Sequence, residues 1–577
     1  MSDQVQRFLD AMTLEQKVGQ MLCYGFCGSY PYPDIVEAVQ KYHVAGFRVT
    51  PRGRVFHRYF GEDHPGAKRV MRAPERLERQ YGVKHVWGRE FSAREYAKTL
   101  NTLREHSLDS CAGVPLYFSL DYEGNQVADI SAQGFQGFPA PMGLTASGDP
   151  SLCRRVARTI GRQLGSVGIN WIHSPVLDVN TKPRNPEIGA RAYSALPDTV
   201  AEYALESLRG FNEARTIATG KHFPGRGASE QDVHFDVATI EESKGRMFDI
   251  HLAPYRNLIA NGLPAIMLAH SIFPSLDPRR EIATLSKAVI SDVLRGELAF
   301  DGVVMTDSFT MGGLVAKYEV AEAAVKAINA GVDLILLKDE NALRGEVFTA
   351  LVDAVRTGRL NEAQVENAAR RVLEAKSRCG LLEASKGIVD LETVQQNLEA
   401  PEHEKVAIEA AQRSIVVLRD ENNLLPLPGK AKVLVAEMSS HKQIQFNNSM
   451  MYTGALYESL LECGIDALYT DFLTDTSFAS DAWPIIEKLA AESDIVIFTA
   501  FHERGSAAPV HIVKKFEELN KPCIMVTNSP YELVVPPSAK TVVVTFSSFT
   551  PSLRAAADVL MGKKPGAKLG FDPSKDY

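Results

Sequence analysis

Residues 216–234 read TIATGKHFPGRGASEQDVH and join a β-like run to a polar loop that contains glycine. The run ends in Lys221 and His222, and the loop closes with a carboxylate and an imidazole two residues apart, Asp232 and His234. Such a loop is too polar for a core, and catalytic or binding residues are often carried on loops held by a rigid scaffold. The stretch therefore predicts a strand that leads into an active-site loop.

The same pattern recurs from about residue 15 to residue 380, where short apolar runs alternate with segments of helical periodicity. Strands are predicted at 44–49, 115–121, 169–180, 216–223, 265–270, 302–307 and 333–337. Polar residues lie at or near the ends of five of them: Asp121, Asp178, His222, His270 and Asp307. In a (β/α)8 barrel the active site forms at these strand ends, so the side chains are predicted to surround one pocket. An open doubly wound sheet is the alternative, but no GxGxxG follows the first strand, and seven or more units favour the TIM-like barrel.

The sequence changes character after a helical segment at 385–412, which we interpret as a linker. Apolar runs at 414–419, 432–438, 494–501, 523–529 and 541–548 then alternate with helix-like segments such as WPIIEKLAAE. These runs predict a second α/β domain, with a mainly parallel sheet and helices on its faces. The predicted organisation is a barrel domain at 1–384, the linker at 385–412 and a C-terminal α/β sandwich at 413–577.

Length, charge and cysteine usage limit the possible partners. A chain of 577 residues is too long for one ordinary core, and its net charge of -8 gives no basic field for nucleic acid. No run of 18 apolar residues predicts a membrane span, and the N-terminus lacks the pattern of a signal peptide. The seven cysteines are widely spread without a CxxC pair, which favours free thiols in a reducing compartment over a zinc site. We therefore expect a cytoplasmic protein that binds neither nucleic acid, nor membrane, nor metal.

Residues 52–94 interrupt the alternation with many arginines and lysines. A solvated insertion is the simpler interpretation, because long insertions in surface loops cost little free energy. The functional alternative is a basic lip beside the pocket that attracts an anionic substrate or caps the barrel mouth.

Asp307 follows the apolar run GVVMT at the predicted catalytic end of its strand, which makes it a candidate nucleophile or base. Its position before a helix suits a helix N-cap equally well. Two other polar residues at strand ends, His173 and His270, are expected to form structural hydrogen bonds rather than to act in catalysis.

Seven segments, in the order in which they occur, resemble glycoside hydrolase family 3. They are SLDYEGNQV (119–127), GINWIHSPVLDVN (168–180), IGARAY (188–193), KHFPGRG (221–227), AIMLAHSIFPSLD (265–277), LSKAVISDVLRGELAFDGVVMTDSFTMGG (285–313) and SIVVLRDENNLLPL (414–427). The resemblance covers nearly the whole chain. It implies a barrel followed by a second α/β domain, a carbohydrate substrate, and neither a metal nor an organic cofactor.

Within this family, the Asp232-Val233-His234 segment resembles the Asp-x-His pair of the β-N-acetylglucosaminidase branch, in which the histidine is general acid and base. The resemblance implies that Asp307 is the nucleophile of a retaining double displacement through a glycosyl-aspartate intermediate. Asp232 would then hold the tautomer and orientation of the His234 imidazole and stabilise its charged form.

The resemblance also implies the residues that bind the sugar. Asp121 is expected to accept hydrogen bonds from hydroxyls of the terminal residue, and Lys221 and His222 to bind neighbouring hydroxyls. Arg191 is expected to donate to the sugar or to its N-acetyl group. For Arg191, a structural ion pair with Asp178 is the alternative.

Four features depart from the usual family motifs. Asn125 replaces the second glycine of DxEGGxVxR, and Asp129 replaces its arginine. Arg226 replaces the second histidine of KHFPGHG, and the stretch FDVATI after His234 lacks the common Leu-Pro. These changes suggest either an altered substrate or altered loop packing.

The predicted function is a retaining, exo-acting glycosidase that removes terminal β-linked N-acetylglucosamine or a related hexosamine. Three alternatives keep the fold. One is a phosphorylase, because a histidine repels an incoming phosphate less than a carboxylate does. The others are a β-glucosidase-type exo-glycosidase and a non-catalytic sugar-binding homologue. The sequence leaves the oligomeric state open.

Overall fold

The computed structural model describes residues 3–28, 30–50, 92–125, 127–130, 134–231, 237–311, 314, 317–338, 342–439, 453–473, 478–502 and 509–577. The chain forms two compact units. The first comprises Met1–Tyr122, Ala157–Val179 and Ser207–Leu398. The second comprises Glu123–Val156, Asn180–Glu206 and Glu399–Tyr577.

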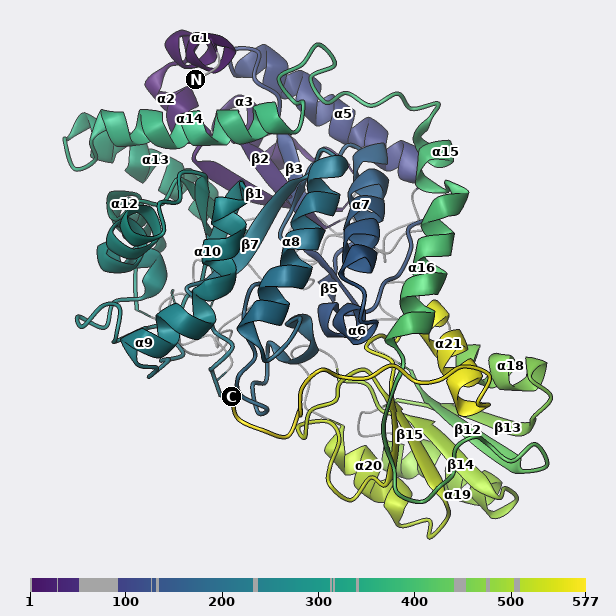
Figure 1. The fold of residues 1–577 in the computed structure, drawn as a ribbon. Helices are drawn as coiled ribbons and strands as arrows, with labels where there is room; N and C mark the ends of the chain where they lie inside the picture. Colours follow the sequence, from purple (N-terminus) through teal and green to yellow (C-terminus); the bar gives the residue numbers. More distant parts are fainter. Residues whose placement is uncertain are drawn as a thin grey trace. The chain divides into compact units, whose positions relative to one another are not determined.

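Within the described residues, the first unit contains a closed barrel of eight parallel strands in the order β1-β10-β9-β8-β7-β6-β3-β2. Figure 1 shows β1, β2, β3 and β7 surrounded by helices. The strands are β1 (Leu22–Cys27), β2 (Gly46–Thr50), β3 (Tyr117–Leu120), β6 (Trp171–Ile172), β7 (Ile217–Phe223), β8 (Ala265–Leu268), β9 (Val303–Ser308) and β10 (Leu334–Leu337). The predicted TIM-like barrel is therefore confirmed.

In the first unit, α1 and α2 precede the first strand and the other helices follow strands, and several helices start with strong sequence signals. Helices α2, α5 and α14 each begin with a capping box, in which the N-cap side chain and a Glu or Gln three residues later bond to each other's backbone N–H. The helical elements are α1 (Asp3–Ala11), α2 (Leu14–Gly19), α3 (Pro33–Gln40), α5 (Ala93–Ser110), α9 (Lys244–Arg246), η3 (Met247–His251), α10 (Ala253–Ala260), η4 (Ala283–Leu285), η5 (Ala288–Glu297), α12 (Val320–Ala330), α13 (Leu343–Arg356), α14 (Glu362–Arg378) and α15 (Val394–Leu398).

Two strands of the barrel differ from the sequence prediction. Strand β1, LCYGFC, was not predicted, and its glycine is a residue type that is depleted in strands. The prediction of a strand over 169–180 is wrong in extent, since β6 comprises only Trp171 and Ile172. Pro175 follows shortly after, and a proline has no N–H to donate to a neighbouring strand.

The barrel interior is filled by side chains that alternate along the strands. Val303 and Met305 of β9, and Leu334 and Leu336 of β10, all belong to one buried cluster. Ala375 of α14 also belongs to this cluster, so a helix contributes to the same core. The interior is thus a packed core, as in other barrels of this kind.

The core of the second unit is built on a six-stranded sheet in the order β11-β16-β15-β14-β12-β13, in which only the β11–β16 pair is antiparallel among the described strands. The prediction of a mainly parallel second sheet is confirmed. Strand β13 was not predicted; it lies at the sheet edge, and only Phe472 of its sequence, DALYTDF, is buried. The sheet strands are β11 (Val416–Asp420), β12 (Lys432–Met438), β13 (Asp466–Phe472), β14 (Ile495–Thr499), β15 (Cys523–Thr527) and β16 (Thr541–Val544).

Helices pack around this sheet, and a short hairpin precedes it in the chain. The helical elements are α6 (Pro141–Ala146), η2 (Gly189–Arg191), α16 (Pro401–Ser414), α18 (Ala455–Glu462), η6 (Phe478–Ala482), α19 (Trp483–Ala491), α20 (Val510–Glu517) and α21 (Thr550–Leu560). The hairpin consists of β4 (Tyr122–Gly124) and β5 (Val127–Ala128).

Segments from the first half of the chain also belong to the second unit. The N–H of Ala140 donates to the carbonyl of Phe546 at 2.9 Å, and Met142 and Ala146 share a core with the sheet strands. Helices α7 (Pro150–Ser166) and α8 (Pro197–Glu213) begin in the second unit and end in the first. The boundaries predicted at 384 and 413 remain a prediction, and α16 lies largely within the predicted linker.

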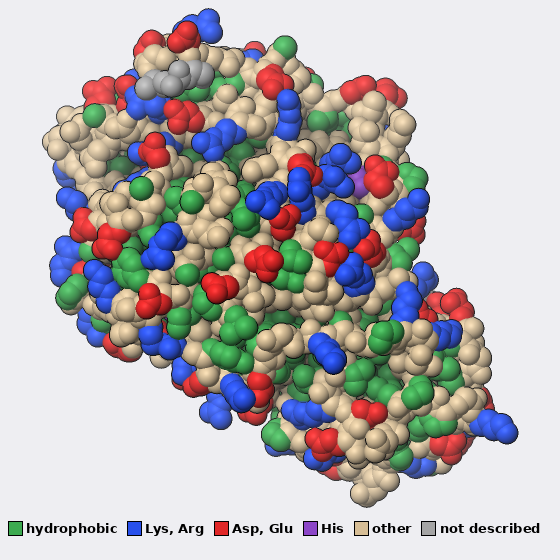
Figure 2. All heavy atoms as spheres, in the orientation of Figure 1, with side chains coloured by type: hydrophobic (Ala, Val, Ile, Leu, Met, Phe, Trp, Pro, Cys, Tyr) green, Lys and Arg blue, Asp and Glu red, His purple; other side chains and the backbone are tan. Residues whose placement is uncertain are grey.

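Two observations concern the surface of the molecule. Basic and acidic side chains are mixed over the face that Figure 2 shows. Within the part of the chain that the structure describes, no helix is long and apolar enough to cross a membrane. The cytoplasmic location remains a prediction. Most of the predicted basic insertion at 52–94, namely residues 52–91, lies outside the described residues.

Candidate active site

Asp121, directly after β3, is held by three neighbours in the barrel. Its Oδ2 accepts hydrogen bonds from Nε and Nη2 of Arg48, at 3.0 and 2.6 Å. Its Oδ1 accepts from Nζ of Lys221 at 2.7 Å, and Nδ1 of His173 lies 3.7 Å from the same oxygen. Arg48 lies on β2 and Lys221 on β7, whereas Asp121 directly follows β3 and His173 directly follows β6. These four strands are neighbours in the barrel, in the order β2, β3, β6 and β7.

The charges around Asp121 decide its protonation. Burial alone would raise the pKa of this carboxyl, but Lys221 and Arg48 outweigh burial and hold the pKa well below its ordinary value. The side chains of Lys221 and Arg48 are themselves nearly inaccessible, with 2% and 7% of their surface exposed. Asp121 is therefore a carboxylate at neutral pH and can accept hydrogen bonds from hydroxyl groups.

Asp178 organises the start of the active-site loop. Its Oδ2 lies 2.7 Å from Nδ1 of His222 and also accepts the backbone N–H of His222 at 3.3 Å. Its Oδ1 accepts the backbone N–H of Arg226 at 2.8 Å. Because an ionised carboxylate only accepts, Nδ1 of His222 carries a proton, and Asp178 fixes the orientation of the ring.

Asp307 lies at the end of β9, and its backbone is held by a buried histidine. The Asp307 side chain is half-buried, and its Oδ1 accepts the N–H of Ser308 at 2.8 Å. Nε2 of His270 donates to the carbonyl of Ser308 at 3.0 Å, and Nδ1 bonds to the hydroxyl of Thr284 at 2.8 Å. Burial lowers the pKa of His270 despite the nearby charge of Asp307, which suits a neutral ring. The expectation that His270 forms structural hydrogen bonds is confirmed.

Arg226, the residue that replaces the usual histidine, is almost fully buried with 1% of its surface exposed. Its positive charge acts on two other buried groups. Burial lowers the pKa of His270, and the charge of Arg226 lowers it further. Burial raises the pKa of Tyr255, and the charge of Arg226 opposes this increase. The arginine thus places a permanent charge beside the barrel site.

Arg191 belongs to the second unit and is held there by two carboxylates. Its Nε and Nη2 donate to Glu123 at 2.7 and 2.9 Å. Its Nη1 donates to the carbonyl of Glu187 at 3.2 Å and lies 3.5 Å from the Glu187 carboxylate. The sequence prediction did not name either of these partners.

The structure thus describes five of the seven predicted site residues. Asp121 and Lys221 are in direct contact, His222 follows Lys221 on β7, and Asp307 lies at the end of β9 in the same barrel. Asp232 and His234 lie outside the described residues. Within the described residues, no group of three or more His, Cys, Asp or Glu side chains could hold a metal ion.

Arg48 is the site residue that the sequence prediction missed. It lies in the middle of β2, whose neighbouring residues are buried and apolar. A charged residue inside an apolar strand is rarely buried unless it is paired. That position was the available signal, although it does not identify the partner.

A comparison with protein-family models matches residues 13–375 to the glycosyl hydrolase family 3 N-terminal domain. The chain belongs to glycosyl hydrolase family 3. The family predicted from the motifs is thereby confirmed.

Relatives of this family 3 chain support the prediction of a glycosidase. A β-hexosaminidase from Pseudoalteromonas piscicida is 29% identical over 58% of this chain, and the match spans 58% of that relative's length. A β-N-acetylglucosaminidase/β-glucosidase from Cellulomonas fimi is 28% identical over 84% of this chain and 87% of its own. A β-hexosaminidase from Idiomarina loihiensis is 32% identical over 46% of this chain and 78% of its own.

Solved structures agree with the fold of this family 3 chain. A family 3 β-N-acetylglucosaminidase from Paenibacillus sp. has a TM-score of 0.81 and 28% identity, and the match covers 98% of this chain and 99% of the other. A β-glucoside phosphorylase has a TM-score of 0.77 at 22% identity, with 99% of this chain and 97% of the other covered. At that identity the second likeness shows the fold alone.

Proposed function

We propose that this family 3 chain is a retaining exo-glycosidase that removes terminal β-linked N-acetylglucosamine or a related hexosamine. The names of the relatives and of the Paenibacillus structure support the choice of sugar. The Asp232-Val233-His234 segment supports the same branch of the family.

The observation that carries the proposal is the charged cluster at the ends of the barrel strands. Asp121 is an ionised acceptor flanked by two cationic donors, Arg48 and Lys221. Sugar hydroxyls both donate and accept, so adjacent acceptors and donors can bind neighbouring hydroxyls of one ring. Asp307 is on the rim of the same barrel, where the anomeric carbon of that ring would be attacked.

In the proposed mechanism, a carboxylate oxygen of Asp307 attacks the anomeric carbon while His234 gives a proton to the leaving oxygen. The bond to the leaving group breaks, and a glycosyl-aspartate forms. His234 then takes a proton from water, which attacks the same carbon and releases Asp307. Two displacements at one carbon retain the β configuration. Asp232 would orient the imidazole through both steps.

Replacement of Asp307 by Asn tests the nucleophile. We expect the hydrolysis of an aryl β-N-acetylglucosaminide to fall by at least about a thousandfold, because the amide is a poor nucleophile. The initial product of the wild-type protein, followed by NMR, should be the β anomer. The matched control is Asp109→Asn on the exposed side of α5, which should retain wild-type rates. Full activity of Asp307→Asn would refute the proposed role.

The acceptor is tested with the same substrate in the presence and absence of inorganic phosphate. Free sugar in both cases supports hydrolysis, and a glycosyl phosphate supports the phosphorylase alternative. Comparing aryl glucoside with aryl N-acetylglucosaminide separates the hexosaminidase from the β-glucosidase alternative. Sugar binding without turnover of either substrate would favour a non-catalytic homologue.

A further inference from the structure

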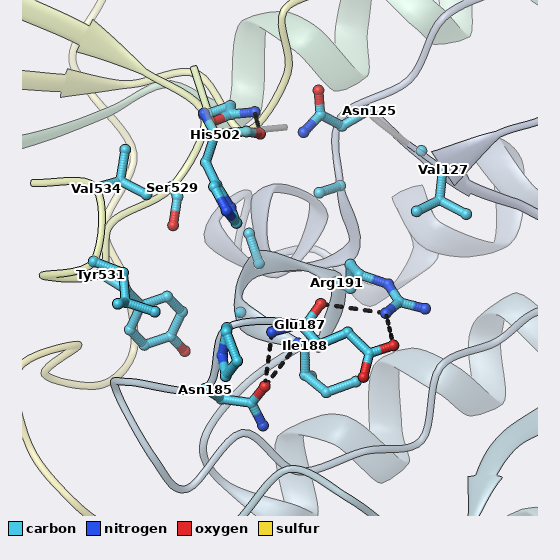
Figure 3. A pocket seen from close by; sticks show the side chains of 17 residues that line it. Asn125, Val127, Asn185, Glu187, Ile188, Arg191, His502, Ser529, Tyr531 and Val534 are labelled. Atoms are coloured by element: carbon cyan, nitrogen blue, oxygen red, sulfur yellow. Dashed lines mark hydrogen bonds and ion pairs between the residues drawn. The ribbon is translucent and has the colours of Figure 1, made fainter. Parts of the chain in front are cut away.

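A cysteine and a lysine meet at the surface of the second unit. Nζ of Lys563 donates a hydrogen bond to Sγ of Cys463 at 2.9 Å, although 100 positions separate the two residues in the chain. Cys463 is half-buried and Lys563 is exposed, so a small solute can approach the pair from solvent. Neither residue is among those that line the pocket around Arg191 and Tyr531, which Figure 3 shows. The mechanism proposed above uses neither of them.

Two packed helices hold the pair together. Cys463 directly follows α18, and its N–H donates to the carbonyl of Ser459 at 3.1 Å. Lys563 comes shortly after α21, and its N–H donates to the carbonyl of Asp558 at 2.9 Å. The two helices pack against each other and contribute leucines to the same buried core. Both backbones are thus held in place, and the flexible lysine side chain can bring its nitrogen onto the sulfur.

The contact joins a sulfur that can be oxidised to a nitrogen that can react with the product. An ammonium group beside a sulfur favours the thiolate, which is the form that peroxides oxidise. The sulfenic acid that results condenses with a thiol or even with a backbone nitrogen. A lysine amine is a better nucleophile than an amide nitrogen, and contact with the sulfur gives it a high effective concentration.

The protonation of the lysine changes during such a reaction. The hydrogen bond to Cys463 is the main cause that raises the pKa of Lys563. Oxidation of the sulfur to a neutral sulfenic acid weakens this cause, so the nitrogen releases its proton more readily once the oxidised sulfur is present.

We propose that Cys463 and Lys563 form a reversible covalent bridge when a peroxide oxidises the thiol. The thiolate attacks one peroxide oxygen, the O–O bond breaks, and the leaving hydroxide takes up a proton to become water. The lysine nitrogen, having released its ammonium proton to solvent, then attacks the sulfur of the sulfenic acid. The S–O bond breaks, and the leaving hydroxide takes a proton from the nitrogen. In total, one thiol, one amine and one hydrogen peroxide give one sulfenamide and two waters, with the sulfur oxidised and the peroxide reduced by two electrons.

The bridge gives the second unit a redox-sensitive link between the C-terminal ends of α18 and α21. It also protects the sulfur from further oxidation to the sulfinic acid, which is irreversible for most proteins. Two molecules of a small thiol reverse it, because they form one disulfide and return the S–N bond to a thiol and an amine. The inference does not depend on the reaction proposed for the barrel.

Peptide mapping of the full chain after treatment with hydrogen peroxide at mildly alkaline pH tests the bridge. We expect a cross-linked pair of peptides that contain Cys463 and Lys563, with the mass of the two peptides less two hydrogen atoms and without tryptic cleavage after the lysine. Dithiothreitol should restore both peptides. Cys463→Ser should remove the cross-link. Lys563→Arg should instead leave a sulfenic acid on Cys463 that dimedone labels, because a guanidinium stays protonated.

Two matched variants serve as controls. Lys564→Arg changes the neighbouring exposed lysine, and Cys523→Ser removes another half-buried cysteine of the same unit. Both should form the cross-link as the wild-type protein does. Equal labelling of Cys463 by dimedone in the wild type and in Lys563→Arg, without a cross-link, would overturn the inference. A disulfide-linked dimer through Cys463 in place of the bridge, or a Cys463 thiol that peroxide leaves unchanged, would overturn it as well.

Discussion

At the level of single residues, the barrel rim keeps several charges buried by pairing each of them. Asp121 joins Arg48 and Lys221, and Asp178 takes hydrogen bonds from His222 and from the backbone of Arg226. A buried charge without such partners is strongly destabilising. These bonds therefore serve the fold and orient the side chains that would meet a sugar.

Replacing Asp121 by Asn tests this dependence. We expect the free energy of unfolding to fall by about 3–5 kcal/mol at neutral pH, because two buried cations lose their partner. The pKa of Asp121 is lowered in the folded state, so its stabilisation is complete above about pH 4 and is lost as the pH falls through the folded-state pKa. Urea unfolding of both proteins at neutral and acidic pH measures the difference, which should shrink with acid. A difference that does not change with pH would contradict this explanation.

At the level of elements, the closure of the barrel depends on β1, a strand that the sequence analysis did not predict. It pairs with β10 through Leu22 and Ile335, and with β2 through Cys23 and Gly46. A Cβ atom on Gly25 would lie 1.7 Å from the carbonyl oxygen of Lys338. The glycine is needed there because two backbones approach closely.

The substitution Gly25→Ala should therefore disturb the closure of the barrel. We expect the free energy of unfolding to fall by at least about 3 kcal/mol, the upper end of the usual range for overpacking. Gly165→Ala in α7 is the control, since a Cβ there meets nothing within 4 Å. The control should change stability by less than about 1 kcal/mol. Urea denaturation measures both, and equal stabilities would contradict the steric explanation.

At the level of the whole molecule, the two units are interleaved along the chain. The second unit takes Glu123–Val156 and Asn180–Glu206 from between strands of the barrel. Met142 and Ala146 of the first of these segments are part of the core formed by the C-terminal sheet. The C-terminal part of the chain is therefore needed to cover segments that belong to the N-terminal half.

A fragment that ends at residue 398 should fold poorly for this reason. We expect it to bind a hydrophobic dye and to lose a sharp thermal transition, because the apolar residues of 123–156 lose the core that covers them. Co-expression with a fragment of residues 399–577 should restore solubility and cooperative melting. A monomeric 1–398 fragment that melts cooperatively would instead support independent domains with the predicted boundaries.

The sequence by itself determined the alternation of strands and helices, the barrel, the second α/β domain and the polar strand ends that include Asp121, Lys221 and Asp307. These features are local, since an apolar run and the residue that follows it are neighbours in the chain. The family motifs added the likeness to glycoside hydrolase family 3, which the comparison with family models confirms.

Only the tertiary structure decided the contacts between residues far apart in the chain. Arg48 reaches Asp121 across 73 positions, and Arg191 reaches Glu123 across 68. The order of strands and the packing of segments 123–156 and 180–206 bring these partners together, and no local pattern specifies them. The same is true of β1 and β13, which the sequence analysis did not predict and which pair with neighbouring strands in the structure.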